Sequence, residues 1–125
     1  MRARFPGDLH APANARVFVT KRLDTIVGSD RTALGDDIVL IVSELVTNSV
    51  RAGAATIDLQ VHADAERVDV RVTDDAAGWP TARAAGVHDQ GGRGLSIIEH
   101  LADSWSTTAH DPGKTVTATW FRRRK

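Results

Sequence analysis

The stretch SELVTNSVRAGA, Ser43–Ala54, is the part of this sequence from which the fold can be inferred most directly. Apolar residues recur at helical spacing through it and just before it, at Ile38, Ile41, Val42 and Leu45. We expect an amphipathic helix that begins at about Thr32 or Asp36, runs to Ala52 and stops at Gly53. A central helix of this length is expected to organise a single core.

Two polar residues of this helix suggest chemistry. Glu44 and Asn48 are four residues apart, so they lie one above the other on one helix face, with Asp37 and Arg51 on roughly the same face. A carboxylate there can accept a proton or orient a water, and an amide oxygen is a neutral ligand that suits Mg²⁺. An ordinary solvated face would carry the same pair, so the spacing alone leaves both interpretations open.

Length and composition place the chain in a broad class. Its 125 residues are enough for one domain with one core, and we expect residues 1–125 to form that single domain. The 16 basic and 16 acidic residues balance, which argues against direct nucleic-acid or membrane binding. There is no cysteine, no signal-peptide core and no run of transmembrane length. We therefore expect a cytoplasmic protein.

The residues before the central helix read as a strand and a second helix. A short strand over residues 2–5 is expected to end at the turn formed by Pro6, Gly7 and Asp8. An amphipathic helix is then expected from about Pro12 to Val27, ended by residues 28–30. These two helices would lie on one face of a sheet.

After Gly53 the hydrophobic period changes from helix to strand. Residues 55–61 and 67–73 alternate apolar and polar positions, and the short link between them predicts an antiparallel hairpin. Residues 76–92 have no apolar period and are expected to form a mobile loop. A short helix after Gly94 and two strands, over 104–109 and 115–121, complete the order β-α-α-β-β-loop-α-β-β. Hairpins with helices on one face predict an α+β fold.

Three further features lie at the ends of these elements. Glycines 91, 92 and 94 precede a helix, whose free amides can receive phosphate oxygens, although a flexible hinge would look the same. Asp74 ends a strand, where a carboxylate can accept a hydrogen bond from an exocyclic amine or simply serve a turn. Thr115, in the triplet from Gly113, could place a hydroxyl in a pocket. The five histidines show no ligand spacing, and no serine lies in a nucleophile elbow.

Taken in this order, these stretches resemble the ATP-binding domain of the GHKL superfamily of gyrase, histidine kinases and mismatch-repair ATPases. The chain is most similar to the small stand-alone anti-sigma-factor serine/threonine kinases of actinobacteria. The matching stretches cover essentially the whole chain: RFPGD (4–8), ELVTNSVRAGA (44–54, similar to the N box), VTDDAAGWP (72–80, the G1 box), GGRGLSII (91–98, the G2 box), LADSW (101–105) and GKTV (113–116).

The resemblance implies roles for individual residues. Asn48 would carry the Mg²⁺ that bridges the nucleotide phosphates, and Glu44 would be the general base. Asp74 would recognise the adenine amine. The remaining cofactor-binding residues implied are Arg51, Gly78, Gly92, Arg93, Gly94, Leu95 and Thr115, with residues from about 81 to 92 as an ATP lid. The implied fold is a Bergerat-type two-layer sandwich, a mostly antiparallel sheet with about three helices on one face.

One position departs from the family pattern. The G1 box of the family reads Asp-x-Gly-x-Gly, and the first of these glycines is Ala76 here. If the backbone there has a positive φ, alanine is strained by roughly 1 kcal/mol, and ATP binding is weakened.

Two functions follow from the resemblance. In the first, the chain is a kinase that uses ATP and Mg²⁺ to phosphorylate a serine or threonine of an anti-sigma-factor antagonist. The second is a non-catalytic partner-switching module that holds a sigma factor or another regulator, with nucleotide as a structural or switching ligand. Family members commonly pair, so a homodimer is a further expectation.

Overall fold

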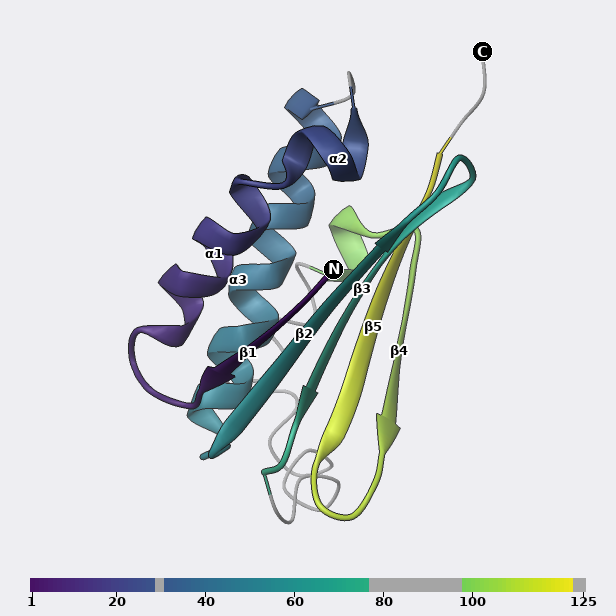
Figure 1. Ribbon diagram of the computed structural model, residues 1–125. Helices are drawn as coiled ribbons and strands as arrows, with labels where there is room; N and C mark the ends of the chain where they lie inside the picture. Colours follow the sequence, from purple (N-terminus) through teal and green to yellow (C-terminus); the bar gives the residue numbers. More distant parts are fainter. Residues whose placement is uncertain (29–30, 77–97, 123–125) are drawn as a thin grey trace.

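The computed structural model describes residues 1–28, 31–76 and 98–122, and within these ranges it has two layers. One layer is a five-stranded sheet, and the helices lie against one of its faces (Figure 1). The α+β class, the antiparallel sheet and the placement of the helices on one face, all expected from the sequence, are confirmed.

Every neighbouring pair of strands in the sheet is antiparallel. The spatial order is β1-β2-β3-β5-β4, and the strands are β1 (Arg2–Pro6), β2 (Thr56–Ala63), β3 (Arg67–Asp74), β4 (Ser104–Ala109) and β5 (Lys114–Phe121). Strands β2 and β3 form the predicted hairpin, and β4 and β5 form a second one. Pro6 lies in the edge strand β1, where a missing backbone N–H is tolerated.

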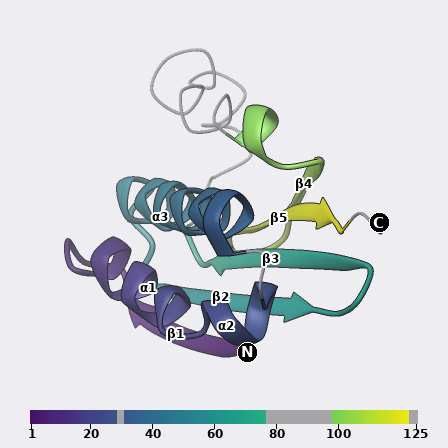
Figure 2. The same ribbon diagram turned by 90° about the horizontal axis from the view of Figure 1, so that it is seen from above.

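Helix α3 (Asp36–Arg51) is the predicted central helix and lies against the sheet (Figure 2). It follows a π-helical turn at Arg31–Gly35 and ends at Ala52, after which Gly53 has φ +85°. Glycine adopts this left-handed conformation readily, which explains why the helix stops there. Residues 98–101 are also helical, within the short helix expected after Gly94.

The helix expected from Pro12 to Val27 is wrong as a single element. The structure has two helices, α1 (Ala11–Thr20) and α2 (Leu23–Val27), separated at Arg22, which has φ −113° and ψ 7°. The Arg22 guanidinium donates to the carbonyl oxygen of Phe18 at 2.9 Å and stacks 3.8 Å over the Phe18 ring. Apolar residues continue at helical spacing through the break, so the sequence pattern did not indicate it.

The core fills the space between the two layers. Helix α3 contributes one buried face, and alternate residues of the central strands contribute the other: Ile57, Leu59 and Val61 from β2, Val68, Val70 and Val72 from β3, and Val116, Ala118 and Trp120 from β5. Side chains at the positions between these point to the opposite face of the sheet. That face is polar, and on it Asp58 accepts hydrogen bonds from Arg2 and Arg4. Among the described helices, none is long and apolar enough to cross a membrane.

Candidate functional site

Helix α3 presents the predicted polar residues next to its buried face. Glu44 and Asn48 are half-buried and lie one turn apart, and Arg51 is exposed in the last turn. The polar stripe borders the apolar stripe, so the Glu44 carboxylate and the Asn48 amide lie at the margin of the core. The pKa of Asp37, on the same stripe, is raised by partial burial and by the neighbouring charge of Asp36.

Asp74 is the last residue of β3, and its side chain is fully buried. It follows Val70 and Val72 at the strand period of two, so its carboxylate points from the sheet towards the helix layer. Ser49 Oγ donates to Asp74 Oδ2 at 2.5 Å. Because Ser49 directly follows Asn48, this bond places the Asn48 end of α3 beside the end of β3. The structure therefore brings two of the predicted site regions together.

Two more groups contact the Asp74 carboxylate. Lys114 is directly opposite Asp74 in the pairing of β3 with β5, and its ammonium forms an ion pair with Oδ2. The backbone N–H of Ala76 donates to Oδ1 at 3.1 Å. The Lys114 side chain is only 6% exposed, and that of Asp74 is 0% exposed. The result is a buried cluster of one carboxylate, one ammonium and one hydroxyl.

The strain that a positive φ would cause at Ala76 is absent. No non-glycine residue in the described ranges has a positive φ, so the backbone at Ala76 is one that alanine adopts readily. Ala76 is itself buried, and its N–H closes a tight turn on the Asp74 carboxylate. The structural reason for expecting weak nucleotide binding at this position is therefore removed.

Thr115 lies on the other face of the sheet from the Asp74 carboxylate. It alternates with the core-facing Lys114 and Val116, and its hydroxyl is 2.9 Å from that of Thr73 and 3.2 Å from His110 Nε2. The structure does not bring Thr115 together with Asp74. The other residues implied by the resemblance, Gly78, Gly92, Arg93, Gly94 and Leu95, lie outside the described residues, as does the expected lid.

Two members of the cluster, Ser49 and Lys114, were not predicted from the sequence. Signals for both were available. Ser49 occupies a position of the apolar face of α3, four residues after Leu45, and Lys114 shares a strand face with Val116 and Ala118. A polar residue in a buried pattern needs a partner, and the sequence offered Asp74.

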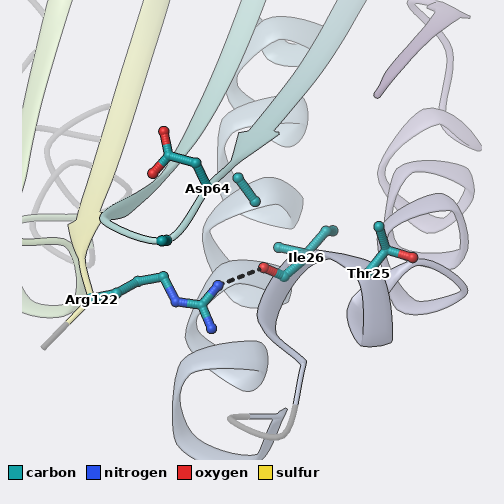
Figure 3. Close-up of a pocket in the computed structure, with 6 residues that line it drawn as sticks. Thr25, Ile26, Asp64 and Arg122 are labelled. Atoms are coloured by element: carbon teal, nitrogen blue, oxygen red, sulfur yellow. Dashed lines mark hydrogen bonds between the residues drawn. The ribbon is translucent and has the colours of Figure 1, made fainter. Parts of the chain in front are cut away.

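A groove of about 430 Å³ lies at the turn of the β2–β3 hairpin, the end of the hairpin away from Asp74 (Figure 3). Thr25, Ile26, Asp64 and Arg122 are among the residues that line it. The Arg122 guanidinium donates to the carbonyl oxygens of Ile26 and Val27 at 3.2 and 3.1 Å. Because Arg122 directly follows β5, these hydrogen bonds connect the end of β5 to the end of α2. None of the predicted site residues lines this groove.

A family model described as the histidine kinase-like ATPase domain matches residues 5–120. The chain belongs to the histidine kinase-like ATPase domain family. The described part of the fold, with α3 facing an antiparallel sheet and Asp74 ending a strand next to it, is thus the framework of an ATPase domain. The family implies a nucleotide site in the chain.

A crystal structure similar to this histidine kinase-like ATPase domain is that of the RsbU and RsbW domains of Rv1364c from Mycobacterium tuberculosis. The two superpose with a TM-score of 0.71 at 21% sequence identity, over 96% of this chain and 31% of the other. At that identity the likeness establishes the fold, and this chain spans about a third of the length of that protein. No curated protein matches the sequence significantly.

Proposed function

We propose that this chain is a serine/threonine protein kinase of the anti-sigma-factor type that phosphorylates an anti-sigma-factor antagonist, with ATP and Mg²⁺ as cofactors. The observation that carries the proposal is the hydrogen bond from Ser49 to Asp74, which joins the helix of Glu44 and Asn48 to the carboxylate expected to recognise the base. The sequence resemblance to stand-alone anti-sigma-factor kinases supports the choice of substrate.

The donor set around Asp74 fits an adenine nucleotide. A carboxylate offers about four lone-pair sites. Oδ2 receives Ser49 and Lys114, and Oδ1 receives the N–H of Ala76, so Oδ1 retains acceptor capacity suited to an exocyclic amine. The Asn48 amide, one turn from Glu44, offers a neutral oxygen of the kind Mg²⁺ accepts alongside phosphates and water.

The proposed roles follow from these positions. Asn48 would hold the metal, and Mg²⁺ bound there would neutralise charge that develops on the phosphates. The partner's serine or threonine hydroxyl attacks the γ-phosphorus. A new P–O bond forms as the bond to the β,γ-bridging oxygen breaks, ADP leaves, and Glu44 takes the hydroxyl proton. Asp74 orients the base, and Ser49 and the Ala76 N–H orient Asp74.

The assignment of Glu44 is tested by phosphoryl transfer from γ-labelled ATP to a panel of purified anti-sigma-factor antagonists. Wild type is expected to label a serine or threonine of one of them. Glu44→Gln should lower the rate by roughly 10²- to 10⁴-fold, the usual contribution of a general base, while ADP binding is retained. Ser43→Ala on the same helix is the matched control, because Ser43 contacts the exposed Arg16. Equal rates in wild type and Glu44→Gln would contradict the assignment.

A second candidate is a non-catalytic partner-switching module that holds a sigma factor or another regulator. The buried ion pair between Lys114 and Asp74 favours it, because the base-recognition carboxylate already has a charged partner within the chain. Nucleotide binding without transfer to any antagonist would select this candidate. A homodimer and a single domain over residues 1–125 remain predictions, the first tested by light scattering and the second by limited proteolysis.

A further inference from the structure

The buried pair formed by Lys114 and Asp74 has a consequence for nucleotide binding. We propose that Lys114 determines the base selectivity and affinity of the site, because its ammonium is paired with Oδ2 of the Asp74 carboxylate, whose Oδ1 a purine amine would use. The inference rests on the proposed role of Asp74 in base recognition.

The contacts of Asp74 show how Lys114 acts on the site. The Lys114 ammonium is paired with Oδ2, to which Ser49 also donates. Oδ1 receives the backbone N–H of Ala76 and retains the acceptor capacity that a purine amine would use. The positive charge of Lys114 therefore lies on the same carboxylate as the acceptor for the base.

The same contact weakens discrimination between bases. A carboxylate without a charged partner attracts a 6-amino group and repels a 6-oxo group, because the oxo oxygen brings its lone pairs against the acceptor. The Lys114 charge compensates that of Asp74, so both the attraction and the repulsion become smaller. We therefore expect the site to bind adenine nucleotides weakly and to prefer them only modestly over hypoxanthine nucleotides.

The test is calorimetric titration of wild type and Lys114→Met with ADP and with IDP, in the presence of Mg²⁺ at pH 8. Lys114→Met is expected to bind ADP roughly tenfold more tightly and to prefer ADP over IDP by roughly tenfold more than wild type does, the size expected for one hydrogen bond to a charged group. Lys21→Met is the matched control, because Lys21 is exposed at the end of α1. Damage to the fold alone lowers both affinities and leaves their ratio unchanged.

An unchanged ADP to IDP ratio, or weaker ADP binding with that ratio preserved, would overturn the inference while leaving the proposed function standing. Failure of wild type and variant to bind either nucleotide would remove both. A second measurement uses wild type only and needs no folded variant. Wild type is expected to prefer ADP over IDP by less than roughly tenfold, because the Lys114 charge compensates that of Asp74. A wild-type preference for ADP well above roughly tenfold would equally overturn the inference.

Discussion

Ser49 on helix α3 donates a 2.5 Å hydrogen bond to the carboxylate of Asp74 at the end of strand β3. Both side chains are buried, and 25 residues of chain separate them. The bond connects the helix layer to the sheet at the point where the candidate site lies. It therefore couples the stability of the fold to the geometry of the site.

Ser49→Ala removes one donor from a buried carboxylate. We expect the free energy of unfolding to fall by about 1–3 kcal/mol, because a buried acceptor that loses a partner is not compensated by water. Urea unfolding followed by circular dichroism measures the change. Ser43→Ala, also on α3, removes only an exposed hydrogen bond from Arg16 of α1 and should change stability far less. Equal effects of the two substitutions would contradict the importance assigned to the buried bond.

Gly113 approaches β3 closely in the turn between β4 and β5. Its φ is +95°, and a Cβ atom there would overlap the carbonyl oxygen of Asp74. Gly113→Ala should destabilise the fold by about 2 kcal/mol or more, since it combines backbone strain with displacement of the strand end. Thermal unfolding is expected to show the loss of stability, and ADP titration is expected to show weaker binding, because the displaced strand end carries Asp74.

Gly35→Ala is the control for Gly113→Ala. Its φ is outside the left-handed range, and an added Cβ would lie 3.5 Å from Leu23 Cδ1, an ordinary contact. A stability close to that of wild type is expected. If Gly113→Ala proved equally harmless, the close approach of this turn to Asp74 would be wrong.

The pKa of Asp58 is held below its usual value, chiefly by the hydrogen bond from Arg2. A carboxyl whose pKa is lower in the folded state stabilises the fold above its ordinary pKa near 4, and this contribution is lost as pH falls through the lowered value. Asp58→Asn should therefore flatten the loss of stability between about pH 5 and pH 2.

Urea unfolding at a series of pH values tests this prediction, with Glu66→Gln in the exposed β2–β3 turn as the control. Because Arg2 is largely exposed, the difference between Asp58→Asn and wild type should shrink in 0.5 M NaCl. A pH profile of Asp58→Asn that superposes on that of wild type would rule out this role for Asp58.

The sequence predicted much of the fold because its periodicity changes sharply at Gly53. Helix α3, the hairpin of β2 and β3 and the strands β4 and β5 were all indicated by period and turn residues. The break at Arg22 was missed because it depends on a side chain that contacts the Phe18 carbonyl and ring, which leaves the apolar spacing intact.

The candidate site could be predicted only in part. Asp74, Glu44 and Asn48 were identified by their residue type and by their place at an element end or on one helix face. The ion pair of Asp74 with Lys114 depends on the register of β3 against β5, two strands that are far apart in sequence. Local patterns mark Lys114 as a polar residue on a buried strand face but do not specify that register, so its pairing with Asp74 follows only from the structure.

The central claim is that the Asn48 end of α3 and Asp74 form a magnesium-dependent nucleotide site. Its most direct test is calorimetric titration with ADP and ATP, with and without Mg²⁺, of wild type and Asn48→Ala, with Thr47→Ala as the control from the adjacent position. We predict magnesium-dependent binding in wild type and Thr47→Ala that is lost in Asn48→Ala. Absence of binding to wild type at millimolar nucleotide, or an Asn48→Ala variant that binds as wild type does, would contradict the claim.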